Sequence, residues 1–147
     1  RVPFMLQWKG RLPAGEVSRQ PVIALDIHPT AVWAAGESVD PTWALDGVTL
    51  LPFLSGEDPG APHEALYWRF VERSGARVGD WKLVRMGDGS DRLFDLSKDI
   101  GEKNDLAKTR PDKLKELQEA YRKWDAGNKP PAWRDSRRKA EVKGGTP

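Results

Sequence analysis

The sequence of 147 residues is long enough for one modest domain with a buried core. Its 24 basic and 22 acidic residues nearly cancel, and the net charge of +2 argues against a dedicated nucleic-acid-binding protein. The absence of cysteine excludes disulfides, thiolate metal sites and a cysteine nucleophile, and no apolar run of about 18 residues exists to span a membrane. With 14 Gly and 12 Pro residues, the chain is also too rich in turns for a helix bundle.

Residues 1–64 are predicted to form the tail end of an α/β layer. Apolar residues on both faces of 2–8 predict a strand buried on both sides. Asp26 is expected to cap the short helix that follows it, by accepting hydrogen bonds from the first backbone N–H groups, and Pro29 then occupies the third helical position. This helix is apolar nearly all round, so we expect it to be sandwiched between other elements. Residues 50–54 are expected to form one helical turn.

From residue 65 the hydrophobic period changes to two, which is typical of half-buried strands. Tight-turn sequences rich in Gly, Ser and Asp separate the apolar segments. Strands this close together can only pair as antiparallel neighbours, because a parallel crossover needs a dozen or more residues. The prediction is a four-stranded meander with strands at 66–71, 76–78, 81–86 and 92–96.

A C-terminal helix completes the predicted subdomain, which runs over residues 65–128. Thr109 is the expected N-cap, Gly127 the expected end, and one face repeats apolar residues at helical spacing. One helix packed across a small antiparallel sheet makes an α+β subdomain. Residues 129–147 are expected to be a disordered tail. The apolar helix face consists of Leu114, Leu117, Tyr121 and Trp124.

No self-sufficient active site can be assembled from these residues. Neither His28 nor His63 lies in a zinc-type cluster, and there is no Gly-rich phosphate loop or G-x-S-x-G elbow. Asp95, Asp99 and Glu102 form an acidic cluster without EF-hand spacing, which favours turn caps over a calcium site.

Five segments in chain order resemble the sulfatases, and together they cover about residues 1–126. They are R-V-P-F with W-K-G and P-A-G in 1–15, D-I-H-P-T with A-G in 26–36, D-G-V with L-P-F-L-S-G in 46–56, R-V-G-D-W-K-L-V in 77–84, and L-F-D-L with the following D, E, N, L and A in 93–107. Each segment is weak evidence alone, whereas five in the same order are specific.

The resemblance implies an arylsulfatase-like hydrolase of sulfuric esters in the alkaline-phosphatase superfamily, whose C-terminal subdomain is a small antiparallel sheet with a packed helix. It also implies calcium and a formylglycine made from Cys or Ser, whose residues would lie upstream of Arg1. No catalytic residue and no metal ligand is therefore assigned in this chain, and the fragment alone is expected to be inactive. Members of the family are often exported or periplasmic.

Four residues are candidates for the rim of a substrate pocket: His63, Trp68, Arg69 and Arg77. Trp68 is suited to stacking on a sugar or aryl ring, and either arginine to binding an anion through paired hydrogen bonds. The competing interpretations are structural, namely core packing for Trp68 and bonding of turn carbonyls or Asp80 for Arg77.

We therefore expect the C-terminal part of a sulfatase, with a sulfated small molecule or glycan and a missing N-terminal catalytic portion as its partners. One alternative is a non-catalytic glycan-binding or structural module. Another is a related phosphoesterase or phosphonate hydrolase.

Overall fold

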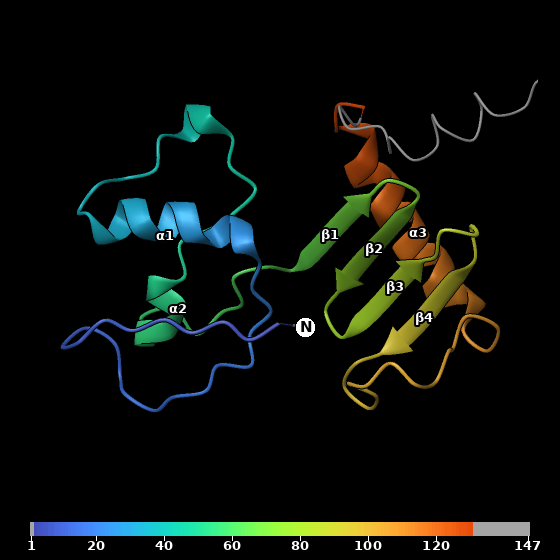
Figure 1. The fold of residues 1–147 in the computed structure, drawn as a ribbon, viewed down its shortest axis with the longest axis horizontal. Coiled ribbons are helices and arrows are strands. Elements are labelled where there is room, and N and C mark those ends of the chain that lie inside the picture. Colours follow the sequence, from blue (N-terminus) through green and yellow to red (C-terminus); the bar gives the residue numbers. More distant parts are fainter. Residues whose placement is uncertain (1, 131–147) are drawn as a thin grey trace, which may run out of the picture. The chain divides into compact units, whose positions relative to one another are not determined.

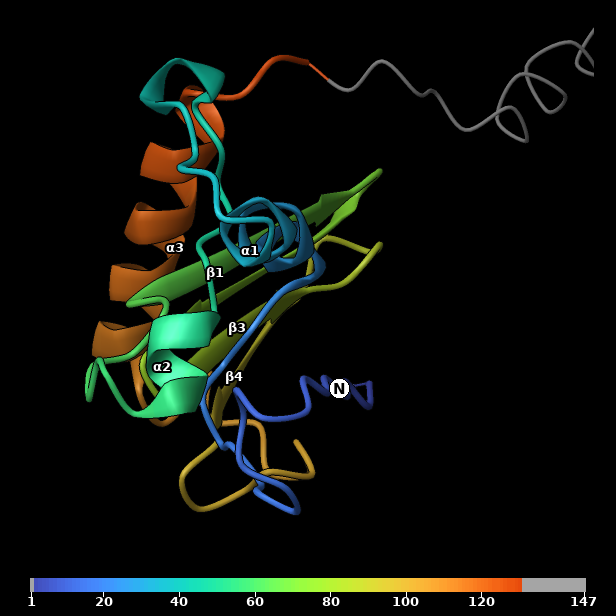
Figure 2. The ribbon, with the colours of Figure 1, turned by 90° about the vertical axis from the view of Figure 1, so that its left-hand side faces the viewer.

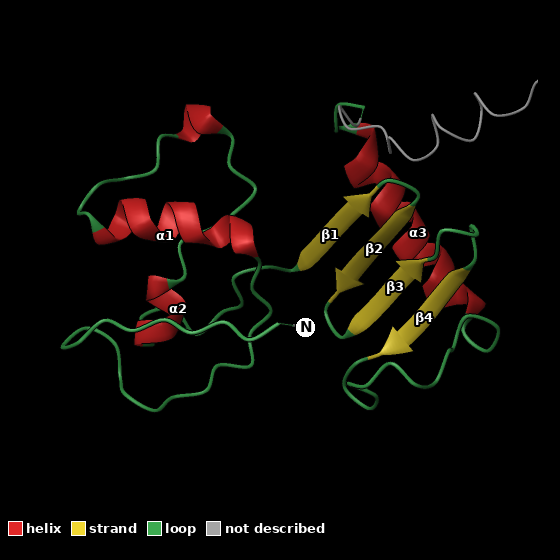
Figure 3. Ribbon diagram, viewed as in Figure 1, coloured by secondary structure: helices red, strands yellow, loops and turns green. Residues whose placement is uncertain are grey.

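A computed structural model of the chain describes residues 2–130, which form two compact units. One unit ends at Glu64 and the other begins at Ala65. The first contains only helices and loops, and the second contains an antiparallel sheet and a helix (Figure 3). Within residues 2–130, every helix is too short or too polar to span a lipid bilayer. The expectation of a disordered tail falls largely on residues 131–147, which lie outside the described range.

The first unit is built from short helices (Figure 1). The expected helical turn is confirmed as α2, whereas the strand predicted at 2–8 is wrong, since these residues are irregular and Met5 is 92% exposed. A strand forms only by pairing with a neighbouring strand, and the described part of this unit contains none. The helical elements are two 3-10 helices at Ala24–Asp26 and Pro41–Trp43, α1 at Ile27–Ala34 and α2 at Leu51–Ser55.

Helix α1 begins differently from the prediction. Asp26 is its N-cap residue, but its side chain bonds no N–H group of the helix. A capping side chain reaches back to the first turn from an extended backbone, whereas Asp26 has helical angles (φ −72°, ψ −17°) because the preceding 3-10 helix runs directly into α1. The prediction of a side-chain cap is therefore wrong, while Pro29 does occupy the third helical position.

The second unit confirms the predicted meander. Its four strands pair antiparallel in the order β1-β2-β3-β4, and α3 (Pro111–Ala126) lies along one face of the sheet in both views (Figures 1 and 2). β2 starts earlier than predicted because Phe70 pairs with Arg73, which leaves a turn of only two residues between β1 and β2. The strands are β1 at Ala65–Phe70, β2 at Arg73–Val78, β3 at Trp81–Arg85 and β4 at Asp91–Asp95.

Helix α3 and the sheet enclose the core of the second unit. Leu117 and Tyr121 are buried and contact the apolar side chains of the central strands, while Leu114 and Trp124 pack at the edge of the same cluster. The helix starts at Pro111 rather than after a Thr109 cap, since the Thr109 hydroxyl donates to the carbonyl of Leu106. Proline is pre-organised for the first helical position and has no N–H group to cap. The strands contribute Ala76, Leu83 and Leu93 to the core.

Candidate functional site

The candidate residues of the second unit lie on opposite faces of the sheet. Tyr67 stacks on Trp124 of α3, with ring centroids 5.2 Å apart, and Arg69 bonds Asp125 of the same helix. Because side chains alternate along a strand, Trp68 points to the opposite side of the sheet, which we call the open face. Trp68 and Arg77 are therefore brought onto the open face, and Arg69 is not.

Trp68 lies over a glycine in the neighbouring strand. It stands directly opposite Gly75, and a Cβ placed on that glycine would lie 3.6 Å from Cε3 of the indole. A Cβ at this position would be in ordinary van der Waals contact with the ring, so the indole lies close to β2 at Gly75. The side chain of Trp68 remains 40% exposed, and its neighbour Phe70 on the same face is also exposed. This part of the open face offers accessible aromatic surface for stacking.

Arg77 lies diagonally across from Trp68, and such positions are about 7–8 Å apart in an antiparallel pair. Its Nε donates to the carbonyl of Gly79 at 2.9 Å, and Nη2 lies 3.7 Å from a carboxylate oxygen of Asp80. Arg77 therefore makes the structural contacts that the sequence left open as an alternative. Its Nη1 makes no hydrogen bond within residues 2–130.

Arg69 is hydrogen-bonded at the C-terminal end of α3. Nη1 donates to Asp125 at 2.5 Å and Nη2 donates to the carbonyl of Lys129 at 2.6 Å. These bonds connect β1 to the helix end. A role at the substrate rim remains a prediction for this residue, but its guanidinium would have to leave both partners to bind an anion.

His63 belongs to the first unit and is almost completely buried. Its Nε2 lies 2.8 and 3.0 Å from the two carboxylate oxygens of Asp26, with side-chain exposures of 8% and 0%. The same carboxylate accepts hydrogen bonds from the backbone N–H groups of Ile23 and Val48. Asp26 is thus the centre of a network that joins the start of α1 to two loops. The rim role of His63 also remains a prediction, and this geometry gives it a structural partner.

The other histidine lies at an exposed groove of the first unit. His28 is at the second position of α1, as expected, and its ring centroid is 5.8 Å from that of Trp43. Leu25, Ile27 and Leu45 line the same groove, whose volume is about 660 Å³.

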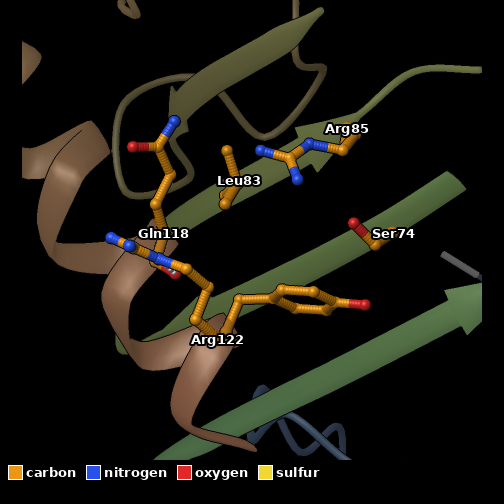
Figure 4. Close-up of a pocket in the computed structure, with 6 residues that line it drawn as sticks. Ser74, Leu83, Arg85, Gln118 and Arg122 are labelled. Atoms are coloured by element: carbon orange, nitrogen blue, oxygen red, sulfur yellow. Dashed lines mark hydrogen bonds between the residues drawn. The ribbon is translucent and has the colours of Figure 1, made fainter. Parts of the chain in front are cut away.

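Sequence reasoning missed a second cavity, between α3 and the sheet (Figure 4). Its helical residues repeat at i, i+3 and i+4, which marks one helix face, but only the strand register shows which sheet residues they meet. The cavity has a volume of about 300 Å³ and is lined by Ser74, Leu83, Arg85, Gln118, Tyr121 and Arg122.

The acidic residues at the end of β4 and just after it are used in turns. Asp95 accepts from the backbone and hydroxyl of Ser97, and Asp99 from the N–H groups of Lys103 and Asn104. Within residues 2–130, no group of three or more metal-ligating side chains comes together. The calcium site that the resemblance implies does not fit these residues, and we derive no step through it.

Known proteins match the chain over most of its length. It is 27% identical over 88% of its residues to the uncharacterized sulfatase YdeN of Escherichia coli, and 33% identical over 82% to arylsulfatase K of Danio rerio. The chain resembles the C-terminal portion of a sulfatase. It spans 30% and 25% of the lengths of these two sulfatases.

A solved structure matches the fold of the chain over most of its length. Ps i-CgsB matches 92% of the chain with a TM-score of 0.76 and 27% identity, and the chain covers 31% of it. That protein has also been solved in complex with k-i-k-neocarrahexaose. No protein-family model matches the chain. The expected α+β class, with a four-stranded sheet and a C-terminal helix, is confirmed.

Proposed function

We propose that this chain is the C-terminal part of a sulfatase that hydrolyses sulfate esters, and that it shapes the substrate site. The observation that carries the proposal is the match to two sulfatases over more than four-fifths of the chain. This match favours a sulfatase over a non-catalytic glycan-binding module or a phosphonate hydrolase. In the proposal, the nucleophile, formylglycine and calcium ligands belong to the remaining catalytic portion.

The open face of the sheet supports a role in holding the organic part of the substrate. Trp68 offers an exposed ring supported by Gly75, and Arg77 offers a fixed guanidinium one diagonal step away. A saccharide that stacks on the indole would bring a sulfate group within reach of the guanidinium, which forms strong bonds with oxyanions. A sulfated glycan is the substrate class that this pair fits.

The first unit supports the existence of a catalytic partner portion. Leu25 and Ile27 of its groove are exposed, as are Trp33 and Trp43 nearby. Exposed apolar surface of this extent marks an interface. Since the matched sulfatases are more than three times as long as the aligned chain, we propose that their catalytic portion is what covers this surface.

Turnover assays test the proposal directly. Sulfate release from 4-nitrophenyl sulfate, with calcium present, should be undetectable for the 147-residue chain and measurable for a polypeptide that joins it to the catalytic portion. Calcium-dependent turnover by the chain alone would overturn the assignment of the missing groups. A joined polypeptide that cleaves a phosphonate ester but no sulfate ester would favour the phosphonate hydrolase instead.

The role of the open face can be separated from folding in the joined polypeptide. Trp68→Ala should raise KM for a sulfated oligosaccharide about three- to tenfold, with a smaller change in kcat, because stacking contributes to ground-state binding. Trp68→Phe should recover part of the loss, since it keeps an aromatic ring. Equal KM values for all three proteins would remove Trp68 from the substrate site.

A further inference from the structure

The strands of the second unit separate their acidic and basic side chains between the two faces of the sheet. Both acidic strand residues, Asp91 and Asp95, lie on the face that α3 covers, opposite Arg85 and Trp81. The open face carries basic strand residues and no acidic one, because the register places each of them on the same side as Trp68. The basic residues of the open face are Arg73, Arg77, Lys82 and Arg92.

The acidic charge of the covered face is paired there. Arg85 donates from Nε and Nη2 to the two carboxylate oxygens of Asp91, both at 2.7 Å, and Gln118 of α3 donates to the same carboxylate at 2.7 Å. Burial acts to raise the pKa of Asp91, but the hydrogen bonds from Arg85 and Gln118 outweigh it and hold the pKa below its ordinary value. This carboxylate therefore stays charged and engaged on the side of the sheet away from Trp68.

On the open face, two of the four basic residues have partners and two do not. Nζ of Lys82 lies 2.6 Å from Oε1 of Glu102, and Arg77 bonds the turn that follows β2. Arg73 and Arg92 are exposed, and neither forms a hydrogen bond or an ion pair with any residue in the range 2–130. The donors of these two guanidinium groups are therefore available to a ligand.

Arg73 and Arg92 lie on either side of one strand. Arg73 belongs to β2 and Arg92 to β4, with β3 between them (Figure 1). Strands two apart are about 10 Å apart, a distance that two arginine side chains can close from both sides. Nε of Arg73 would lie 3.7 Å from a Cβ placed on Gly87, so its side chain extends toward the turn between β3 and β4. Asp88 in that turn is hydrogen-bonded by Ser90 and forms no ion pair with either arginine, and Arg92 acts on it only at longer range.

The row of the sheet that contains Trp68 ends at Arg92. Trp68 stands opposite Gly75, Gly75 opposite Val84, and Val84 opposite Arg92. An exposed ring on one edge strand and an exposed cation on the other are thus separated by a glycine and a half-buried valine. Three strand spacings make this row about 14 Å long, which is more than a single sugar ring covers.

We propose that Arg73 and Arg92 bind a second sulfate group of the glycan that stacks on Trp68. The open face then selects glycans that carry sulfate on more than one sugar, with Arg77 binding the first sulfate group. Guanidinium groups form strong, paired hydrogen bonds with oxyanions of this kind. The identity of the ligand as a sulfated glycan rests on the proposed function, whereas the second anion position rests on the register, the exposure and the unpaired donors of the two arginines.

An NMR titration of the whole 147-residue chain tests the proposal. The probes are N,N′-diacetylchitobiose with one 6-sulfate group and the same disaccharide with a 6-sulfate group on both sugars. The disulfate should bind about tenfold more tightly at matched ionic strength, because it gains a hydrogen bond between charged groups. Saturable shifts are expected at the Trp68 indole and, with the disulfate, at the amides of Arg73 and Arg92.

Substitutions assign the gain in affinity to the two arginines. Arg73→Gln and Arg92→Gln should each remove most of the advantage of the disulfate and change the affinity for the monosulfate less than twofold. Arg122→Gln is the matched control, since it removes the same side chain from an exposed position on α3, which covers the other face of the sheet. It should change the affinity for either probe less than twofold.

Three results would overturn the second anion position. They are equal affinity for the two probes, equal weakening of the disulfate by Arg122→Gln and Arg73→Gln, and binding of inorganic sulfate at Arg73 and Arg92 as tightly as the disulfate. Trp68→Ala should weaken both probes, whereas Arg73→Gln should weaken only the disulfate. A failure of the second position is therefore distinguishable from a failure of the stacking site, and neither measurement depends on turnover.

Discussion

Replacing His63 by alanine removes one partner from a completely buried carboxylate. Asp26 then keeps only its two backbone donors, Ile23 and Val48, and loses contacts of 2.8 and 3.0 Å to the imidazole. A lost hydrogen bond to a carboxylate costs about 1.5–3 kcal/mol. We therefore expect His63→Ala to destabilise the first unit by at least about 1.5 kcal/mol.

Amide hydrogen exchange measures this loss where it occurs. The Val48 N–H bonds Asp26 directly, so its exchange reports the opening of the network separately from the second unit. A cost of 1.5–3 kcal/mol corresponds to exchange that is faster by about ten- to 150-fold. His28→Ala is the matched control, because His28 is exposed and has only a ring contact with Trp43.

One result would refute the reasoning. If His63→Ala changes the exchange of Val48 no more than His28→Ala does, the Asp26 network does not hold the loops together. The imidazole would then be available for the pocket role that its sequence position suggested.

Three further predictions concern packing and pH. Leu117→Ala should lower the free energy of unfolding of the second unit by about 2–5 kcal/mol in urea denaturation, and Lys115→Ala on the exposed face by less than about 0.5. Gly47→Ala should speed amide exchange throughout the first unit, because its Cβ would lie 2.1 Å from the carbonyl oxygen of Leu25. The folded-state pKa of Asp91 is lowered, so its stabilisation is present above the ordinary carboxyl pKa and is lost as pH falls below about 4. Asp91→Asn should accordingly reduce the difference in unfolding free energy between pH 7 and pH 3.

The second unit was predictable because its signals are local. Alternating apolar residues with short turns determine a meander, and apolar residues at spacings of three and four determine one helix face. The first unit depends on contacts between distant residues. Asp26 bonds Val48 and His63, which are 22 and 37 positions away, so no local pattern shows that its carboxylate turns away from the helix it precedes.

The same distinction between local signals and contacts of distant residues applies to the candidate site. The alternation of β1 shows that Trp68 and Arg69 point to opposite faces, but not which face the helix covers. The structure puts Arg69 under α3, where Asp125 binds it, and leaves Trp68 exposed. The cavity lined by Ser74 and Arg122 requires both the strand register and the rotation of the helix, neither of which a single sequence contains.

Two segments that carry the sulfatase resemblance form one structural unit. Asp26 and Thr30 lie one helical turn apart, and they bond the N–H groups of Val48 and Leu50, two residues apart on a neighbouring segment. Gly47 allows that segment to approach, because no side chain fits against Leu25.

The resembling segment at 77–84 also holds a turn in place, since Arg77 bonds Gly79 and Asp80. Three of the segments that resemble the family, at 26–36, 46–56 and 77–84, therefore supply bonds that hold loops and turns of this chain in place. The exposed ring of Trp68 lies outside those segments. Substitution of Trp68 should consequently change ligand preference while the fold is retained, whereas substitutions at Asp26 or Gly47 should unfold the first unit before any ligand is tested.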